Sequence, residues 1–167
     1  MEGLRHSLLA SAGGTVIILF STVDALKRMV MTRYAAKDDA GKPLFPVPYA
    51  PWKPVSEKYQ DKADKVLRAF RMWENIKEWT VVAMPLMWTV ALYGGSLPWV
   101  TEPMVEVAVL GSSLLFSIGN FIYSKSYIEA TEKRIRGFAI RRRVFEFWLF
   151  GSIACVACGA LTRFGVM

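Results

Sequence analysis

Four long stretches of the chain contain no Asp, Glu, Lys or Arg, and charged stretches separate them. They are residues 8–23, 79–101, 107–124 and 147–162. A helix needs about 20 apolar residues to cross the hydrocarbon core of a bilayer. The first stretch can be extended through residues 24–31, where Asp24 can pair with Lys27 and Arg28, and the last backward through Val144. The pattern therefore predicts an all-α membrane protein, a bundle of four transmembrane helices.

We expect these helices over about residues 8–33, 64–97, 103–134 and 139–163, in a single domain that takes up residues 1–167. Residues 41–56 contain five prolines, which forbid helix and favour extended backbone, so this segment is predicted to be a loop. Its apolar side chains are unusual for a solvated linker. They indicate packing on the bundle or the membrane surface, or contact with a partner; they are Leu44, Phe45, Tyr49 and Trp52.

Composition supports the membrane interpretation. Hydrophobic residues make up 53% of the 167 residues, and four uncharged helices in so short a chain would leave too little polar surface for a soluble fold. Arg5 and His6 precede the first apolar stretch, as in a secretory signal. We expect a retained membrane helix there instead.

Lys and Arg are unevenly placed along the chain. Twelve of the 21 lie within residues 27–77 and seven within residues 125–143, whereas the connection between the second and third stretches has none. The positive-inside rule puts both basic connections at the cytoplasm or matrix and both termini on the non-cytoplasmic side. The net charge of +7 thus reflects topology, and we expect no nucleic-acid partner. The endoplasmic reticulum is the first expectation for the organelle, and a mitochondrial membrane is the second.

Metal and thiol chemistry have little support. Cys155 and Cys158 form a C-x-x-C pair inside the fourth apolar stretch, where a thiol is poorly ionised and lacks the further ligands of a zinc site. We expect both to be packing residues. His6 is the only histidine, which excludes histidine-based zinc, haem and general-base sites within the bundle.

A polar stripe lies where the second helix meets the membrane, in the sequence RAFRMWENIKEW. At 100° per residue, Arg68, Arg71, Asn75 and Glu78 fall within an arc of about 80°. A solvated helix start would explain such a stripe in a soluble protein. Because the uncharged stretch begins at Trp79, Glu78 lies near the headgroup level, where ionisable residues tend to be functional.

A second stripe lies on the third helix near the same basic side. Asn120, Tyr123, Tyr127 and Arg134 occupy an arc of about 60°. Interfacial tyrosines often form only an aromatic belt, but the arginine at helical spacing weakens that alternative. The two stripes are therefore expected to form one polar site.

The residue types in the two stripes suit a small peptide that carries acids and a thiol. Arginines bind carboxylates with paired hydrogen bonds, Glu78 can hold an ammonium, and Asn75 can satisfy an amide. A cation such as Arg134 lowers the pKa of a nearby thiol and favours the nucleophilic thiolate. Glutathione combines all these groups.

The sequence RAFRMWENIKE resembles the signature Arg-x-x-Arg-x-x-x-Asn-x-x-Glu of the membrane-associated proteins in eicosanoid and glutathione metabolism, the MAPEG family. Tyr123, Tyr127 and Arg134 are similar to the two tyrosines and the thiol-activating arginine of the family's third helix. Arg33 stands where the family places another glutathione-binding arginine. The chain departs from the family pattern at two places. The family often has a proline about seven residues after the asparagine, where this chain has Val82, and the nearest proline is Pro85. Arg136 stands where an alanine is common.

The resemblance implies a glutathione-dependent transferase or peroxidase that acts on lipophilic electrophiles or lipid hydroperoxides entering from the bilayer. It implies a homotrimer with glutathione bound between subunits on the cytoplasmic side. In that assignment Arg134 stabilises the thiolate and Tyr123 hydrogen-bonds the sulfur. The residues implied to hold glutathione are Arg33, Arg68, Arg71, Asn75, Glu78, Asn120 and Tyr127.

Two alternatives to an enzyme remain open. The departures from the family pattern and the apolar proline loop also fit a catalytically silent, structural subunit or scaffold of a larger membrane complex. A channel or transporter fits less well, because the ionisable residues gather at one membrane face and not at the midplane.

Overall fold

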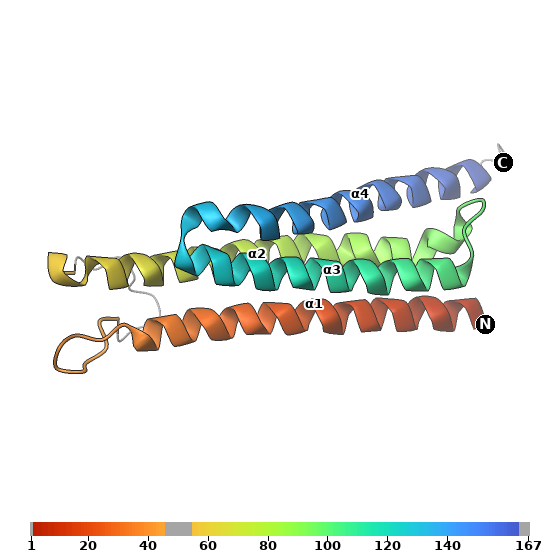
Figure 1. The fold of residues 1–167 in the computed structure, drawn as a ribbon. Helices are drawn as coiled ribbons and strands as arrows, with labels where there is room; N and C mark the ends of the chain where they lie inside the picture. Colours follow the sequence, from red (N-terminus) through yellow and green to blue (C-terminus); the bar gives the residue numbers. More distant parts are fainter. Residues whose placement is uncertain (1, 46–54, 164–167) are drawn as a thin grey trace.

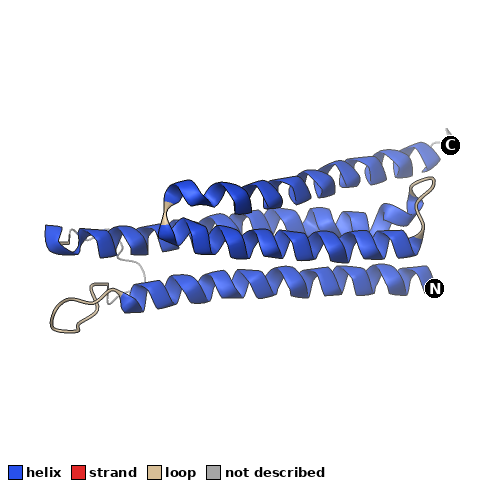
Figure 2. Ribbon diagram, viewed as in Figure 1, coloured by secondary structure: helices blue, strands red, loops and turns tan. Residues whose placement is uncertain are grey.

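The computed structural model describes residues 2–45 and 55–163, with side chains from Ser7 onward. Four long helices run side by side: α1 (Glu2–Ala35), α2 (Gln60–Tyr93), α3 (Glu102–Glu129) and α4 (Ile135–Arg163) (Figure 1). Three short 3-10 helices connect them: η1 (Glu57–Tyr59), η2 (Gly94–Ser96) and η3 (Thr131–Arg134). The start of α1 and the end of α4 lie at the same end of the bundle. Within the described residues Figure 2 shows helices and loops and no strand, which confirms the all-α prediction.

Three parts of the chain are long and apolar enough to cross a membrane: Ser7–Ala35, Glu102–Glu129 and Thr131–Arg163. α2 does not meet that criterion. Its uncharged part begins only at Trp79, and the helix ends at Tyr93, so the rest of the uncharged stretch forms η2 and a turn. In that turn Trp99 takes a left-handed φ of 71°. The structure therefore shows four helices, of which three are candidate spans.

The break between α3 and α4 comes earlier than the periodicity predicts. α3 ends at Glu129, and Ala130 is extended, with φ −156° and ψ 140°. The amide of Lys133 then donates to the carbonyl of Ala130, which starts η3. Arg134 thus lies on a separate turn and not on the last turn of α3.

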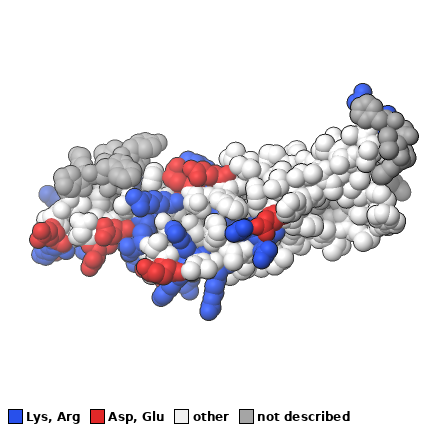
Figure 3. All heavy atoms as spheres, turned by 90° about the horizontal axis from the view of Figure 1, so that it is seen from above, with Lys and Arg blue, Asp and Glu red and all other residues white. Residues whose placement is uncertain are grey.

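Charged and apolar surfaces occupy different parts of the molecule. Figure 3 shows Lys, Arg, Asp and Glu gathered over one half of the bundle, while the other half of this face is largely uncharged. Large apolar side chains point outward from every helix, as in a surface that faces lipid. Examples with exposed fractions above 60% are Leu9, Phe20, Val81, Val107, Phe150 and Val156.

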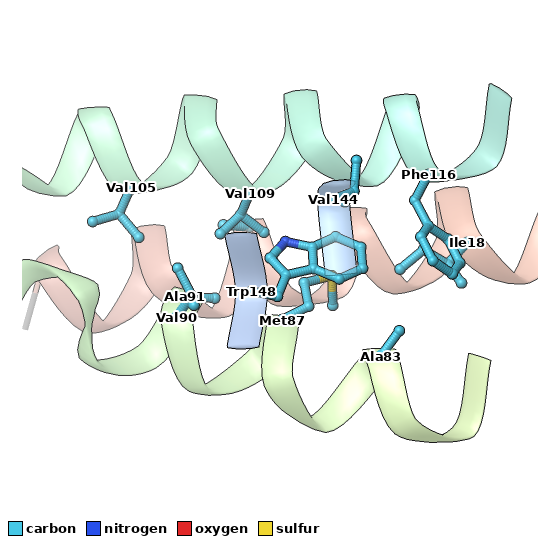
Figure 4. Close-up of a cluster of buried hydrophobic side chains, with 11 residues drawn as sticks. Ile18, Ala83, Met87, Val90, Ala91, Val105, Val109, Phe116, Val144 and Trp148 are labelled. Atoms are coloured by element: carbon cyan, nitrogen blue, oxygen red, sulfur yellow. The ribbon is translucent and has the colours of Figure 1, made fainter. Parts of the chain in front are cut away.

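A buried cluster joins the four helices in the uncharged half (Figure 4). Trp148 of α4 is its largest member and is fully buried. The indole packs against Phe116 with ring centroids 5.3 Å apart, and its N–H donates to the Ser112 hydroxyl at 2.9 Å. The indole N–H of Trp148 therefore has a hydrogen-bond partner inside the bundle, as a buried polar group requires.

The predicted ion pair at the end of α1 is confirmed between Asp24 and Arg28, with Nε 2.5 Å from the carboxylate. Part of the predicted loop packs on its own bundle: Phe45 is buried against Ala63 and Val66 of α2. Tyr49 and Trp52 lie outside the described residues.

Cys155 is a free, buried thiol, and among the described residues no cluster of His, Cys, Asp and Glu could hold a metal.

α3 and α4 are in close backbone contact at two glycines, Gly119 and Gly137. A Cβ on Gly137 of α4 would lie 2.7 Å from Cα of Tyr123 and 2.8 Å from the carbonyl oxygen of Gly119. Both neighbours are backbone atoms, so the helices themselves would have to separate. This contact places Tyr123 against the start of α4.

Gly137→Ala is expected to destabilise the protein by about 2 kcal/mol, because the added methyl group overpacks a backbone contact. Thermal or denaturant unfolding in detergent micelles measures the effect. Gly159→Ala is the matched control on the same helix, since a Cβ there meets nothing within 4 Å. Equal stability of the two variants would contradict the close approach.

Candidate functional site

A cavity of about 340 Å³ lies where α2, α3, η3 and α4 meet. Its walls are Asn75, Tyr123, Arg134, Ile135 and Phe138. This volume is within the range of roughly 300–1,000 Å³ that is typical of ligand pockets. The structure thus brings one residue of the first polar stripe and two of the second to a single cavity.

Within this site, stacked aromatic rings connect Tyr123 to Arg134. The rings of Tyr123 and Tyr127 are parallel within 10°, with centroids 5.4 Å apart, as their spacing of four residues on α3 allows. The guanidinium carbon of Arg134 lies 5.5 Å from the Tyr127 ring centroid. Although the helix breaks at Ala130, η3 folds Arg134 back toward the tyrosines.

Arg141 of α4 is the residue of this region that the sequence analysis missed. It is fully buried, and its guanidinium carbon lies 4.4 Å from the ring centroid of Tyr123 and 5.0 Å from that of Trp79. Its Nη2 donates to Oδ1 of Asn75 at 2.9 Å. Its Nε and Nη1 are buried and have no hydrogen-bond partner among the described residues. It is the first of three consecutive arginines, so the sequence offered no signal that separates it from Arg142 and Arg143.

The remaining residues of the first stripe lie outside the cavity wall. Nε of Arg68 donates to the carbonyl of Ile128 at 3.3 Å, which ties α2 to the end of α3. Arg71 and Glu78 are exposed in the single chain. Glu78 borders a separate groove of about 210 Å³ together with Trp79 and other apolar residues of α2 and α4.

Two further predicted ligand-binding residues have structural contacts away from the cavity. Asn120 is buried, and its Nδ2 donates to the Ser21 hydroxyl of α1 at 3.0 Å. Nε of Arg33 donates to the carbonyl of Phe45 at 3.0 Å, at the end of α1. Within one chain, therefore, Asn120 joins two helices and Arg33 holds the loop.

No protein-family model matches the chain, and no curated protein does. The likeness of the two polar stripes to the MAPEG pattern therefore remains a resemblance. What the chain can do chemically is inferred from the residues around the cavity.

Proposed function

We propose that the chain is an integral membrane protein that binds glutathione in this cavity and uses it on lipophilic electrophiles or lipid hydroperoxides. The observation that carries the proposal is the cavity at the charged part of the bundle, with Asn75, Tyr123 and Arg134 in its wall. An amide, a phenol and a guanidinium there offer hydrogen-bond donors to an acidic thiol peptide. The MAPEG-like spacing of the same residues supports the choice of glutathione.

The chemistry follows from the charge of Arg134. A free thiol has a pKa near 8.5 and is mostly protonated at neutral pH, so a neighbouring guanidinium increases the thiolate fraction. The hydroxyl of Tyr123 can donate a hydrogen bond to the sulfur. In a conjugation the sulfur forms a bond to the electrophilic carbon, the leaving group departs with its electron pair, and the thiol proton goes to solvent. The apolar groove beside Trp79 offers a nearby surface for a lipophilic substrate.

The proposal includes four spans with both termini on the non-cytoplasmic side, in the endoplasmic reticulum first and a mitochondrial membrane second. α2 would cross with part of its polar stripe in contact with other helices, since Asn75 accepts from Arg141 of α4 and Arg68 donates to the end of α3. The common position of the start of α1 and the end of α4 supports this topology (Figure 1). The concentration of Lys and Arg in two connections supports the orientation.

The proposal also includes a homotrimer, and Arg71 provides its test. Arg71 and Glu78 are exposed in the single chain, on the stripe that contains Asn75, as expected for residues completing a site between subunits. Arg71→Ala is expected to weaken glutathione binding about tenfold or more without unfolding the protein, because a charge-assisted contact to a carboxylate is lost. Calorimetry on detergent-purified protein measures the glutathione affinity of each variant. Light scattering on the same sample gives the mass of the oligomer.

Lys77→Ala is the control for Arg71→Ala, because Lys77 is an exposed cation on the opposite side of the same helix and pairs with Glu74 at 2.9 Å. Its glutathione affinity should equal that of the wild type. A folded wild-type protein that binds no glutathione would refute the proposed function.

A catalytically silent subunit of a larger complex is the second candidate, and one observation favours it. Several polar-stripe residues already have partners that hold the bundle together, such as Arg68 with the carbonyl of Ile128 and Asn75 with Arg141. A purified protein that forms a glutathione-binding trimer without other subunits would count against it.

A further inference from the structure

Arg141 carries a buried charge that the chain only partly compensates. One of its nitrogens donates to Asn75, and the rings of Tyr123 and Trp79 lie against the guanidinium. Two further N–H bearing nitrogens have no hydrogen-bond partner among the described residues. A buried cation with unsatisfied donors is costly, so its retention calls for an anion nearby or a role in a site.

The contact with Arg141 fixes which way the Asn75 amide points. A guanidinium has five N–H donors and no acceptor, so the amide atom that faces it has to be the oxygen. The NH2 branch of Asn75 then faces away from the Arg141 guanidinium. Because Asn75 lines the cavity, its NH2 group can serve as a hydrogen-bond donor there.

We propose that Arg141 is a positioning residue that locks Asn75 as a donor, and that the cavity between Asn75 and Arg134 receives an acidic oxygen group of the ligand. Arg134 in the wall and Arg141 behind Asn75 and Tyr123 supply two positive charges. Carboxylate and phosphate oxygens are pure acceptors and suit such a site. Glutathione carries two carboxylates, so the inference deepens the proposed function and rests on it only for the identity of the ligand.

Asn75→Asp separates this role from a structural one. The aspartate keeps an oxygen for Arg141 and adds an opposite charge, so the protein should melt at the same temperature as the wild type or higher. Toward the cavity the variant presents an anionic acceptor in place of a donor, so glutathione binding should fall tenfold or more. Asn75→Leu, which cannot accept from Arg141, should lower both the melting temperature and the affinity. An Asn75→Asp protein that binds glutathione as tightly as the wild type overturns the inference.

A second measurement distinguishes failure of the inference from failure of the proposed function. The melting temperature of the detergent-purified wild type is recorded with glutathione, succinate or inorganic phosphate at equal ionic strength. Stabilisation by glutathione supports both proposals. Stabilisation by succinate or phosphate alone supports the acid site and refutes glutathione as its ligand. No stabilisation by any of the three overturns the acid site itself.

Discussion

Trp148→Ala is expected to lower the free energy of unfolding by about 3 kcal/mol, the largest single-residue effect on stability that we expect. Trp148 is fully buried, packs on Phe116 and is the largest side chain of the cluster that joins the four helices. Its removal leaves a cavity whose lining loses dispersion contacts. Because lipid and not water surrounds the proposed spans, packing contributes most of this cost. Denaturant unfolding in detergent micelles measures it.

Phe147→Ala is the matched control, since Phe147 is the neighbouring aromatic residue and is 46% exposed on the outside of α4. Its unfolding free energy should change by less than half as much. Trp148→Phe keeps one aromatic ring and loses the hydrogen bond to Ser112 together with part of the ring volume, with an expected cost of about 2 kcal/mol. Equal losses for Trp148→Ala and Phe147→Ala would show that Trp148 is not the centre of the core.

Arg134→Ala is expected to reduce glutathione conjugation at neutral pH about a hundredfold, comparable to the loss of one oxyanion donor in other enzymes. In the wild type the guanidinium should lower the pKa of the bound thiol. A lowered thiol pKa means that the thiolate is already present at lower pH. In the variant the rate should rise with pH toward the ordinary thiol pKa of about 8.5. A pH–rate profile with a lipophilic electrophile in micelles records both changes.

Two variants control this experiment. Arg134→Lys keeps the positive charge and should retain most of the shift in the pH profile. Lys133→Ala removes the adjacent, exposed cation, which lies 3.8 Å from Glu129, and should leave the profile unchanged. Unaltered turnover in Arg134→Ala would refute the role of Arg134 while leaving the fold and the cavity intact.

The helices could be predicted from the sequence because each helix contains a long uncharged stretch. Their ends were less predictable. Nothing in the periodicity marks Ala130 as extended, and the spacing of the polar stripe predicts an unbroken helix to Arg134. The uncharged stretch that begins at Trp79 does not show where α2 ends, because η2 and the following turn consist of uncharged residues too.

The candidate site was only partly predictable. Tyr123 and Tyr127 were placed on one face by their spacing, and the structure stacks their rings. Asn120 lies on the same face one turn earlier, yet it meets Ser21 of α1 and not the cavity. Helical spacing sets which residues share a face, but the neighbour that faces each turn depends on how the helices cross.

The sequence by itself determined the helical class, the uncharged stretches and the gathering of Lys and Arg in two connections, because these follow from local hydropathy and charge. The tertiary structure alone decided the part played by Arg141. It is the first of three consecutive arginines, and composition cannot distinguish it from Arg142 and Arg143. The register of α4 after the break, fixed by the close contact at Gly137, turns Arg141 inward and leaves the other two exposed. Successive residues differ by about 100° around a helix, so only one of three neighbours can face Asn75.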